Sequence, residues 1–280
     1  MIINGLEVAS KIKKELKNKI IDLNAKGIVP CLATILVGED PASSTYVKNK
    51  HKACLELGIL TKDRRMPSTT TQKELIELIK MLNIDKSIHG ILLQLPIPKH
   101  IDEFEVVNTI DPKKDVDGLT NFSSGLLFNN RANLIPCTPH GIIKLFEYYN
   151  IELDGKDIVI INRSNLVGKP LSILLLQRNA TVTICHSHTK NLDEKLRKAD
   201  IIITAVGNRK KFTLKNEDVK DNVIIVDVGI SRENGKVIGD VEFDSIANKA
   251  AWITPVPGGV GPMTITMLLQ NTITASSFTN

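Results

Sequence analysis

The spacing of apolar residues along the chain changes between the repeat of an amphipathic helix and the continuous run of a buried strand. Over residues 6–25 apolar side chains recur at helical spacing among lysines, which predicts a helix that ends at Gly27. The next run, CLATILVG at 31–38, is short, apolar and rich in β-formers, so it predicts a strand. The chain therefore opens with a helix that leads into a strand.

The same alternation continues through the first half of the chain. Residues 58–67 and 89–98 predict further strands, and residues 71–83 and 101–110 predict helices. Because strands that alternate with helices form βαβ units, this half predicts a parallel sheet. The charged, turn-rich segment DPKKDVDGLT at 111–120 follows, and we place the first domain boundary there.

The second half of the chain has a longer alternation of the same kind. Its predicted helices and strands, in chain order, are 137–150, 157–162, 168–179, 181–187, 200–207, 222–229 and 262–277. Strand runs that are apolar throughout are typical of a parallel sheet covered by helices on both faces. The second half is therefore predicted to be Rossmann-like, and the whole chain to be an α/β protein.

Length and composition limit the kinds of partner. The chain has 280 residues, which suffices for one large or two ordinary domains. Lysine and arginine number 36 against 31 acidic residues, and the net charge of +5 weakly favours acidic ligands. Aromatic residues make up 4% of the chain, which argues against base-stacking platforms. We expect a small-molecule ligand and no nucleic acid.

The cysteines and histidines suggest neither disulfides nor metal. Cys31, Cys54, Cys137 and Cys185 lie far apart without a CxxC pair, so a reducing cytoplasm is the natural setting. The start of the chain lacks the apolar core of a signal peptide, and no later segment has the length or apolarity of a membrane span. No histidine spacing pairs with a carboxylate or a metal. A soluble, cytoplasmic protein without a metal site is predicted.

Residues 38–58 hold the first candidate for chemistry. A strand-like run ends in a turn here, and Asp40 with Pro41 supplies a cap and first turn for a helix. Tyr46 and Lys50 stand four residues apart, so their side chains share one face of that helix. Ligand crevices of open α/β sheets lie at this end of a strand, where a phenol and an amine could serve a planar substrate. Surface decoration is the alternative interpretation.

Four further stretches of the sequence favour a functional role for Tyr46 and Lys50. They are GILLQLPIP at 90–98, DPKKDVDGLT at 111–120, NRSNLVGKP at 162–170 and PVPGGVGPMT at 255–264. Together, in this order, they resemble the bifunctional methylenetetrahydrofolate dehydrogenase/cyclohydrolase family over nearly the whole chain. The resemblance rests on the set, since several unusual strings would have to recur by chance.

The resemblance implies a bifunctional enzyme of one-carbon metabolism. It implies oxidation of 5,10-methylenetetrahydrofolate to the 5,10-methenyl form with hydride passing to NADP, then hydrolysis to 10-formyltetrahydrofolate. Residues 1–118 with the C-terminal helix at 261–280 would form the catalytic, folate-binding domain. Residues 119–260 would form the NADP-binding domain, with the active site in the cleft between the two. A homodimer through the cofactor domain is a further expectation.

Gln94 and Asp117 have ordinary interpretations beside the functional ones. Gln94 could be a satisfied core glutamine, and Asp117 could belong to a solvated turn. The resemblance implies instead that Gln94 holds the amine of Lys50 and that Asp117 accepts hydrogen bonds from the pterin. Tyr46 would stack on the aminobenzoyl ring. Lys50 would help to activate water, as base or as proton donor, because a desolvated amine deprotonates within reach of neutral pH.

The segment PVPGGVGPMT at 255–264 is conformationally unusual, because prolines fix φ and glycines allow conformations that other residues do not tolerate. By resemblance it borders the folate and the nicotinamide, and an interdomain hinge is the structural alternative. The further substrate contacts that the resemblance implies are Ser43, Leu95, Pro96, Pro257, Gly258, Gly259 and Thr264.

Residues 157–170 run from a strand through a turn into a helix, which is the context of a nucleotide-phosphate loop. Asn162 stands where the family usually has glycine, and asparagine is the other residue that best tolerates left-handed backbone, so the turn can survive. A merely tight connection has the same pattern. The resemblance implies a dinucleotide site lined by Asn162, Arg163, Ser164, Gly168, Ser187 and Ile230.

The strand end CHSHTK at 185–190 favours NADP over NAD. NAD-type domains place an acidic residue about 20 residues beyond the glycine loop. This segment has no carboxylate, while Ser187, Lys190 and, in the loop, Arg163 could hold a 2′-phosphate. A polar strand end, with NAD held by backbone alone, is the alternative.

One region departs from the family pattern. The family commonly has an asparagine and an arginine where Ser123 and Leu126 stand, so local contacts there are expected to differ.

Two rival functions would have different sequence features. A dehydrogenase of the amino-acid or shikimate type would lack the LQLP and DVDG strings. A non-enzymatic nucleotide-binding module would have no need of Tyr46 with Lys50.

Overall fold

The computed structural model describes residues 1–39, 41–233 and 235–278, and it leaves the side chains of residues 41–46 undescribed. The chain forms two compact units. Unit 1 joins Met1–Ser10 to Thr138–Thr264, and unit 2 joins Lys11–Cys137 to Ile265–Asn280. In the part of the chain that is described, no helix has the length and apolarity needed to cross a membrane.

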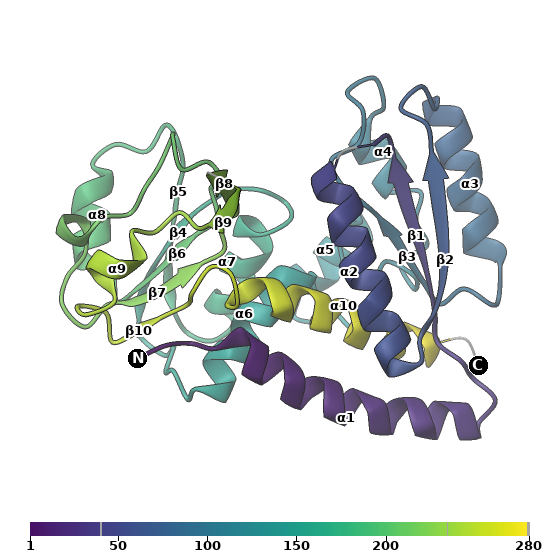
Figure 1. Ribbon diagram of the computed structural model, residues 1–280, viewed down its shortest axis with the longest axis horizontal. Helices are drawn as coiled ribbons and strands as arrows, with labels where there is room; N and C mark the ends of the chain where they lie inside the picture. Colours follow the sequence, from purple (N-terminus) through teal and green to yellow (C-terminus); the bar gives the residue numbers. More distant parts are fainter. Residues whose placement is uncertain (40, 234, 279–280) are drawn as a thin grey trace. The chain divides into compact units, whose positions relative to one another are not determined.

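Unit 2 is built on a three-stranded parallel sheet in the order β2-β1-β3. Its elements are α1 (Gly5–Ala25, which begins in unit 1), β1 (Cys31–Val37), α2 (Pro41–Leu57), β2 (Leu60–Met66), α3 (Gln72–Ile84), β3 (Gly90–Leu93), α4 (Glu103–Val107) and α5 (Asn121–Phe128). Helices α3 and α4 lie on one side of this sheet and α2 on the other (Figure 1). The sheet is thus covered on both faces.

The core of unit 2 explains why the first strand has no polar face. Every residue of β1 is buried. Four alternate residues of the strand, Cys31, Ala33, Ile35 and Val37, belong to one core cluster with Leu75 and Ile79 of α3, and the residues between them face the opposite layer. The start of α3 is fixed by a capping box, in which Thr71 and the carboxylate of Glu74 satisfy each other's backbone N–H groups.

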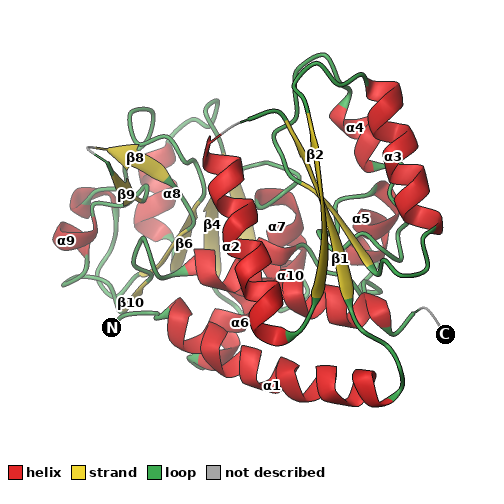
Figure 2. Cartoon of the chain, turned by 45° about the vertical axis from the view of Figure 1, so that its right-hand side comes forward, coloured by secondary structure: helices red, strands yellow, loops and turns green. Residues whose placement is uncertain are grey.

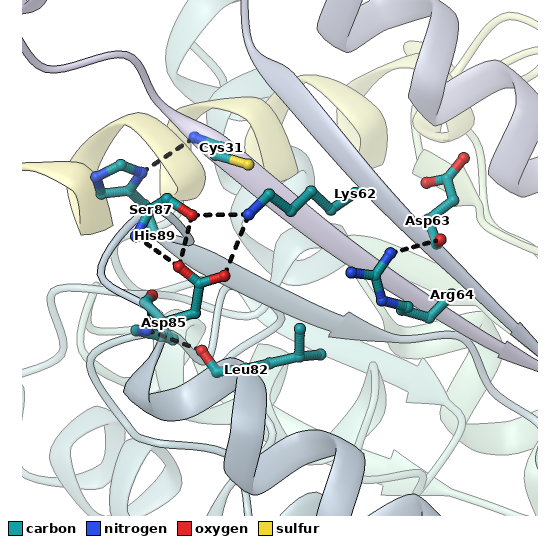
Figure 3. A network of polar contacts seen from close by, with 9 residues as sticks. Cys31, Lys62, Asp63, Arg64, Leu82, Asp85, Ser87 and His89 are labelled. Atoms are coloured by element: carbon teal, nitrogen blue, oxygen red, sulfur yellow. Dashed lines mark hydrogen bonds and ion pairs between the residues drawn. The ribbon is translucent and has the colours of Figure 1, made fainter.

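A polar network ties together the amino-terminal ends of the three strands in unit 2 (Figure 3). The Lys62 ammonium donates to Asp85 Oδ2 at 3.1 Å and to Ser87 Oγ at 2.7 Å. The Cys31 N–H donates to His89 Nδ1 at 3.1 Å. Because ligand sites of parallel sheets lie at the carboxyl ends of strands, we interpret this network as structural.

Unit 1 is built on a five-stranded parallel sheet in the order β10-β7-β6-β4-β5. Its elements are α6 (Cys137–Tyr148), β4 (Asp157–Ile161), α7 (Gly168–Leu176), β5 (Thr181–Cys185), α8 (Leu192–Lys198), β6 (Ile201–Thr204), η1 (Asn216–Asp218), β7 (Ile224–Asp227), β8 (Ser231–Glu233), β9 (Lys236–Ile238), α9 (Phe243–Ile246), β10 (Trp252–Ile253) and α10 (Val260–Ser276, which ends in unit 2). Side chains of α8 and α9 pack on one face of the sheet, and α7 lies on the other (Figure 2).

The predicted α/β class and the predicted parallel sheets are confirmed. Every predicted strand and helix is present, although the strand predicted over residues 89–98 ends at Leu93, before Pro96, which cannot donate to a sheet, and α10 begins at Val260 and not at Pro262. The apolar pattern of the sequence did not predict α5, α8, the β8–β9 hairpin, α9 or β10. These elements are short, and most lack a clear apolar repeat.

Candidate functional site

Lys50 of α2 is buried, with 7% of its surface exposed, and its Nζ donates to Gln94 Oε1 at 3.2 Å. Gln94 directly follows β3, and its own N–H donates to Ile35 O at 2.9 Å. The Gln94 amide nitrogen donates to Leu95 O at 2.8 Å. Because that bond fixes which end of the amide is the donor, the oxygen end is the one that faces the lysine.

Lys50 interacts with an acidic partner, Asp117, whose charge affects its ionisation. Burial lowers the pKa of Lys50, and the negative charge of Asp117 opposes that shift. Burial raises the pKa of Asp117, and Lys50 opposes it. The Cys137 thiol has a pKa well above its usual value because it is buried and because Asp117 adds negative charge. Lys50 can therefore lose its proton more easily than a surface lysine, whereas Cys137 stays a thiol.

The turn that carries Asp117 is held by its neighbour Asp115. The Asp115 carboxylate accepts hydrogen bonds from Leu119 N–H at 3.1 Å and Thr120 N–H at 2.8 Å. Gly118 has a φ of 67°, a left-handed conformation that favours glycine. The backbone on both sides of Asp117 is thus tightly defined.

The structure brings three of the four predicted catalytic residues together and leaves the fourth undescribed. Lys50, Gln94 and Asp117 lie in one group. Leu95 and the exposed Pro96 adjoin it, joined by a cis peptide bond. The side chains of Ser43 and Tyr46, and all of Asp40, lie outside the described residues.

The predicted cofactor residues of unit 1 follow the carboxyl ends of its parallel strands. Asn162 comes directly after β4, Ser187 after β5 and Ile230 after β7. The register pairs Ile161 with Cys185 across β4 and β5, so these strand ends lie side by side. This edge of an open α/β sheet is where such folds bind ligands.

Asn162 holds the loop after β4 through its side chain. Its Oδ1 accepts from the N–H groups of Ser164 at 2.8 Å and Gly168 at 3.0 Å, and its Nδ2 donates to Ala205 O at 2.6 Å. Asn162 does not have a positive φ, so left-handed backbone is not what the turn uses. A Cβ on Gly168 would lie 2.2 Å from Asn162 O, which explains the glycine. Both ends of the Asn162 side-chain amide therefore hydrogen-bond to backbone groups of the protein.

The groups left for a ligand at this edge fit an anionic dinucleotide. Arg163 and Ser187 are exposed, and the Arg163 side chain makes no hydrogen bond or ion pair with any residue the structure describes. Ile230 is 52% exposed and offers an apolar contact. The strand end 185–190 carries no carboxylate. A cation and a hydroxyl without a competing anion suit a phosphate.

The segment 255–264 is held by neighbours within unit 1. The N–H of Leu6, at the start of α1, donates to Gly258 O at 3.2 Å. Gly258 has a φ of 107°, and the turn 257–259 leaves Pro257 exposed. Thr264 and Thr138 share a hydrogen bond of 2.9 Å between their hydroxyls. The predicted rigidity therefore has identifiable contacts behind it.

Two buried carboxylates that the sequence analysis did not single out organise the neighbouring loops. Asp227, at the end of β7, accepts from Gly229 N–H at 3.0 Å. Asp240 accepts from Val206 N–H at 2.7 Å and Gly207 N–H at 3.0 Å. Burial raises the pKa of Asp227 to about 6. An acidic residue within the otherwise apolar strand run of β7 was the available signal.

Comparison with known proteins identifies the family of this chain. The model of the tetrahydrofolate dehydrogenase/cyclohydrolase catalytic domain matches residues 3–117, and that of its NAD(P)-binding domain matches residues 136–280. The bifunctional protein FolD of Nitrosopumilus maritimus is 55% identical over 278 residues, which cover 99% of this chain and 97% of the relative.

Solved structures agree with this assignment. The bifunctional FolD enzyme of Campylobacter jejuni is 48% identical, with a TM-score of 0.96 over 99% of both chains. The FolD enzyme of Trypanosoma brucei, solved with NADP cofactor and an inhibitor, is 35% identical with a TM-score of 0.94, over 99% of this chain and 97% of that one. The chain therefore belongs to the tetrahydrofolate dehydrogenase/cyclohydrolase family, the bifunctional FolD enzymes of one-carbon folate metabolism.

Proposed function

We propose that this chain oxidises 5,10-methylenetetrahydrofolate to the 5,10-methenyl form with NADP and then hydrolyses that product to 10-formyltetrahydrofolate. The observation that carries the proposal is the group formed by the buried Lys50 with the half-buried Gln94 and Asp117. A lysine is rarely buried unless it is paired, and perturbed ionisation in such a group is typical of functional sites.

Lys50 is the proposed proton-transfer residue of the hydrolysis. Burial lowers its pKa, so part of the population is neutral at a lower pH than for a surface lysine, and a neutral amine can take a proton from attacking water. Gln94 holds the amine through the hydrogen bond at 3.2 Å. The pH dependence of the hydrolysis rate distinguishes an amine that acts first as a base from one that acts first as an acid.

Asp117 is the proposed partner of the pterin. A carboxylate offers two oxygens to the two-donor edge formed by the pterin's amino group and ring N–H. The backbone turn supported by Asp115 fixes the direction of this side chain. Ser43, Tyr46, Leu95 and Pro96 are proposed further folate contacts on the strength of the family pattern alone.

The edge of unit 1 that holds Arg163, Ser164, Ser187 and Ile230 is the proposed NADP site. When bound there, NADP supplies the chemistry of the first reaction by accepting hydride. Arg163 and Ser187 would bind the 2′-phosphate and Ile230 would contact the dinucleotide, while Asn162 and Gly168 shape the loop. Pro257, Gly258, Gly259 and Thr264 are proposed to border the nicotinamide and the folate.

The domain roles and the assembly are proposals of the same kind. Residues 1–118 with 261–280 would form the folate-binding domain, supported by the catalytic-domain match over residues 3–117, and residues 119–260 the NADP-binding domain. A homodimer through the cofactor domain is supported by the edge position of β5 and by the exposed Leu176 and Ile184 near it. Sedimentation of the parent and of Ile184→Lys tests the dimer, since the charge should dissociate it.

A single assay tests the function. The purified protein is incubated with 5,10-methylenetetrahydrofolate and NADP, and the absorbances of reduced cofactor and of the methenyl product are followed. We expect both to rise and the methenyl signal then to decay by hydrolysis. Formation of reduced cofactor with an amino acid or a shikimate-type substrate but not with the folate would refute the proposal, as would dinucleotide binding without turnover.

A further inference from the structure

Asn271 is a buried amide in α10 that the proposed function does not yet use. It is 2% exposed and is surrounded on its helix by buried apolar residues such as Met267 and Leu268. A buried amide costs free energy unless its N–H groups find acceptors. An asparagine at this position therefore calls for specific partners.

The amide nitrogen of Asn271 uses both of its hydrogens on backbone carbonyls from two other segments. It donates to Val116 O at 2.8 Å and to Ile135 O at 2.8 Å. Val116 directly precedes Asp117, and Ile135 lies two residues before Cys137, whose thiol is close enough to Asp117 for the carboxyl to raise its pKa. One side chain thus joins the two segments that surround the Asp117 carboxyl.

The segments 116–118 and 135–137 are also in direct van der Waals contact, with no room for an added side-chain atom at Gly118. A Cβ on Gly118 would lie 2.9 Å from Pro136 N and 3.2 Å from the carbonyl carbon of Ile135. The Cys137 thiol donates to Val116 O at 3.3 Å, on the same oxygen that Asn271 uses. A small separation of the segments would break these contacts together and redirect the side chain between them.

We propose that Asn271 is a positioning residue for Asp117, holding the turn at 116–118 against residues 135–137 so that the carboxylate keeps its direction toward the folate and Lys50. This inference rests on the proposed role of Asp117 in folate binding. Asp115 anchors the same turn from its other side through Leu119 and Thr120. With one anchor removed, the turn keeps its fold but loses the fixed direction of Asp117.

A merely stabilising role for Asn271 makes a different prediction. A destabilised enzyme has fewer active molecules, which lowers the apparent kcat and leaves the folate KM unchanged. A misdirected Asp117 weakens folate binding in every molecule, so the folate KM rises while the KM for NADP, which is proposed to bind in unit 1, stays as it was. The split between the two KM values separates the roles.

The test compares three single variants with the parent enzyme. Asn271→Leu keeps the size of the side chain and removes both donors, and we expect its folate KM to rise about tenfold, the effect of losing roughly one hydrogen bond's free energy. Asn271→Ser keeps one donor, and we expect its folate KM to lie between those of the parent and of Asn271→Leu. Thr272→Val is the matched control, because Thr272 is the next residue, is fully buried, and donates only to Leu268 O of its own helix, at 2.8 Å.

The double variant Asp117→Asn with Asn271→Leu isolates the connection between the two residues. If Asn271 acts through Asp117, the double variant should bind folate about as weakly as Asp117→Asn alone. Fully additive losses, an unchanged folate KM in Asn271→Leu and Asn271→Ser, or an equal rise in Thr272→Val would overturn the inference. A parent-like folate KM in Asp117→Asn itself would instead refute the proposed role of Asp117, and the inference with it.

Discussion

Replacing Lys50 by methionine removes a buried ammonium group and keeps a flexible apolar stem of similar length. In the parent this group donates to Gln94 Oε1 at 3.2 Å and carries the charge opposite to Asp117. The variant leaves the glutamine oxygen without this donor and the carboxyl without its cation. The pKa of Asp117, already raised by burial, should therefore rise further.

The expected loss falls mainly on the hydrolysis. General acid–base catalysis contributes about 10²- to 10⁴-fold, which corresponds to roughly 3 to 5 kcal/mol of activation free energy. The free energy of unfolding should fall by only about 1 to 3 kcal/mol, the cost of one unsatisfied buried acceptor. Dinucleotide affinity should not change, because the proposed cofactor residues belong to unit 1 and Lys50 to unit 2.

Lys114→Met is the matched control for this substitution. Lys114 is equally buried, at 7% exposed, and its Nζ donates to Leu82 O at 2.9 Å and Asp85 O at 2.8 Å, at the end of α3. Its loss should lower stability by a similar amount and leave proton transfer intact. Hydrolysis of the methenyl substrate, dinucleotide titration and thermal unfolding are measured on both variants and the parent.

The pH dependence of the hydrolysis rate in the parent enzyme shows which protonation state of Lys50 is active. If neutral Lys50 takes a proton from water, the hydrolysis rate rises with pH through a pKa below the usual value for lysine. If the ammonium form donates a proton, the rate falls across the same range. A loss of less than tenfold in Lys50→Met, or an equal loss in Lys114→Met, would refute Lys50 as the proton-transfer residue.

Three further outcomes are expected. Asp117→Asn should weaken folate binding by roughly 1.5 to 3 kcal/mol, the value of a charged hydrogen bond, with NADP binding unchanged; calorimetric titration that finds equal folate affinity would remove Asp117 from the site. NADP should be preferred over NAD by about ten- to a hundredfold in kcat/KM, and the joint removal of Arg163 and Ser187 should reduce that preference, which comparison of the two cofactors measures. Asp227 binds its proton more tightly when folded, since its pKa is raised to about 6, so its contribution to stability is lost as pH rises from about 4 to 6. Chemical unfolding of the parent and of Asp227→Asn across that range should diverge by up to about 3 kcal/mol, and parallel curves would contradict the assignment.

The sequence predicted the central strands of the parallel sheets well because these strands are buried on both faces, unlike the edge strands β2 and β5. A run such as residues 31–37 has no polar position, and the structure buries every residue of it. The elements that were missed bury little surface. Helix α8 has one buried residue, and the β8–β9 hairpin is largely exposed, so neither has an apolar pattern to detect.

Candidate residues could be chosen from motif strings, but their contacts depend on tertiary structure. The bond between Lys50 and Gln94 joins residues 44 positions apart, and it needs the pairing of β1 with β3 to form. Ser123 departs from the family pattern and is buried at the start of α5. Its polar groups have a partner there, because its hydroxyl accepts a hydrogen bond from the Thr120 hydroxyl and its N–H donates to the same hydroxyl. Such a local cap was readable from the sequence only once the helix was known.

Asn162 and Asn271 show why the remaining contacts could not be foreseen. Both side chains bind main-chain groups: Asn162 reaches Gly168 N–H and Ala205 O, and Asn271 reaches the carbonyls of two separate segments. Backbone groups are the same at every position, so no residue type in the sequence marks the partner. A family motif identifies the side chains that would meet the ligand. The amides that hold those side chains in place become visible only when the folded backbone supplies their acceptors.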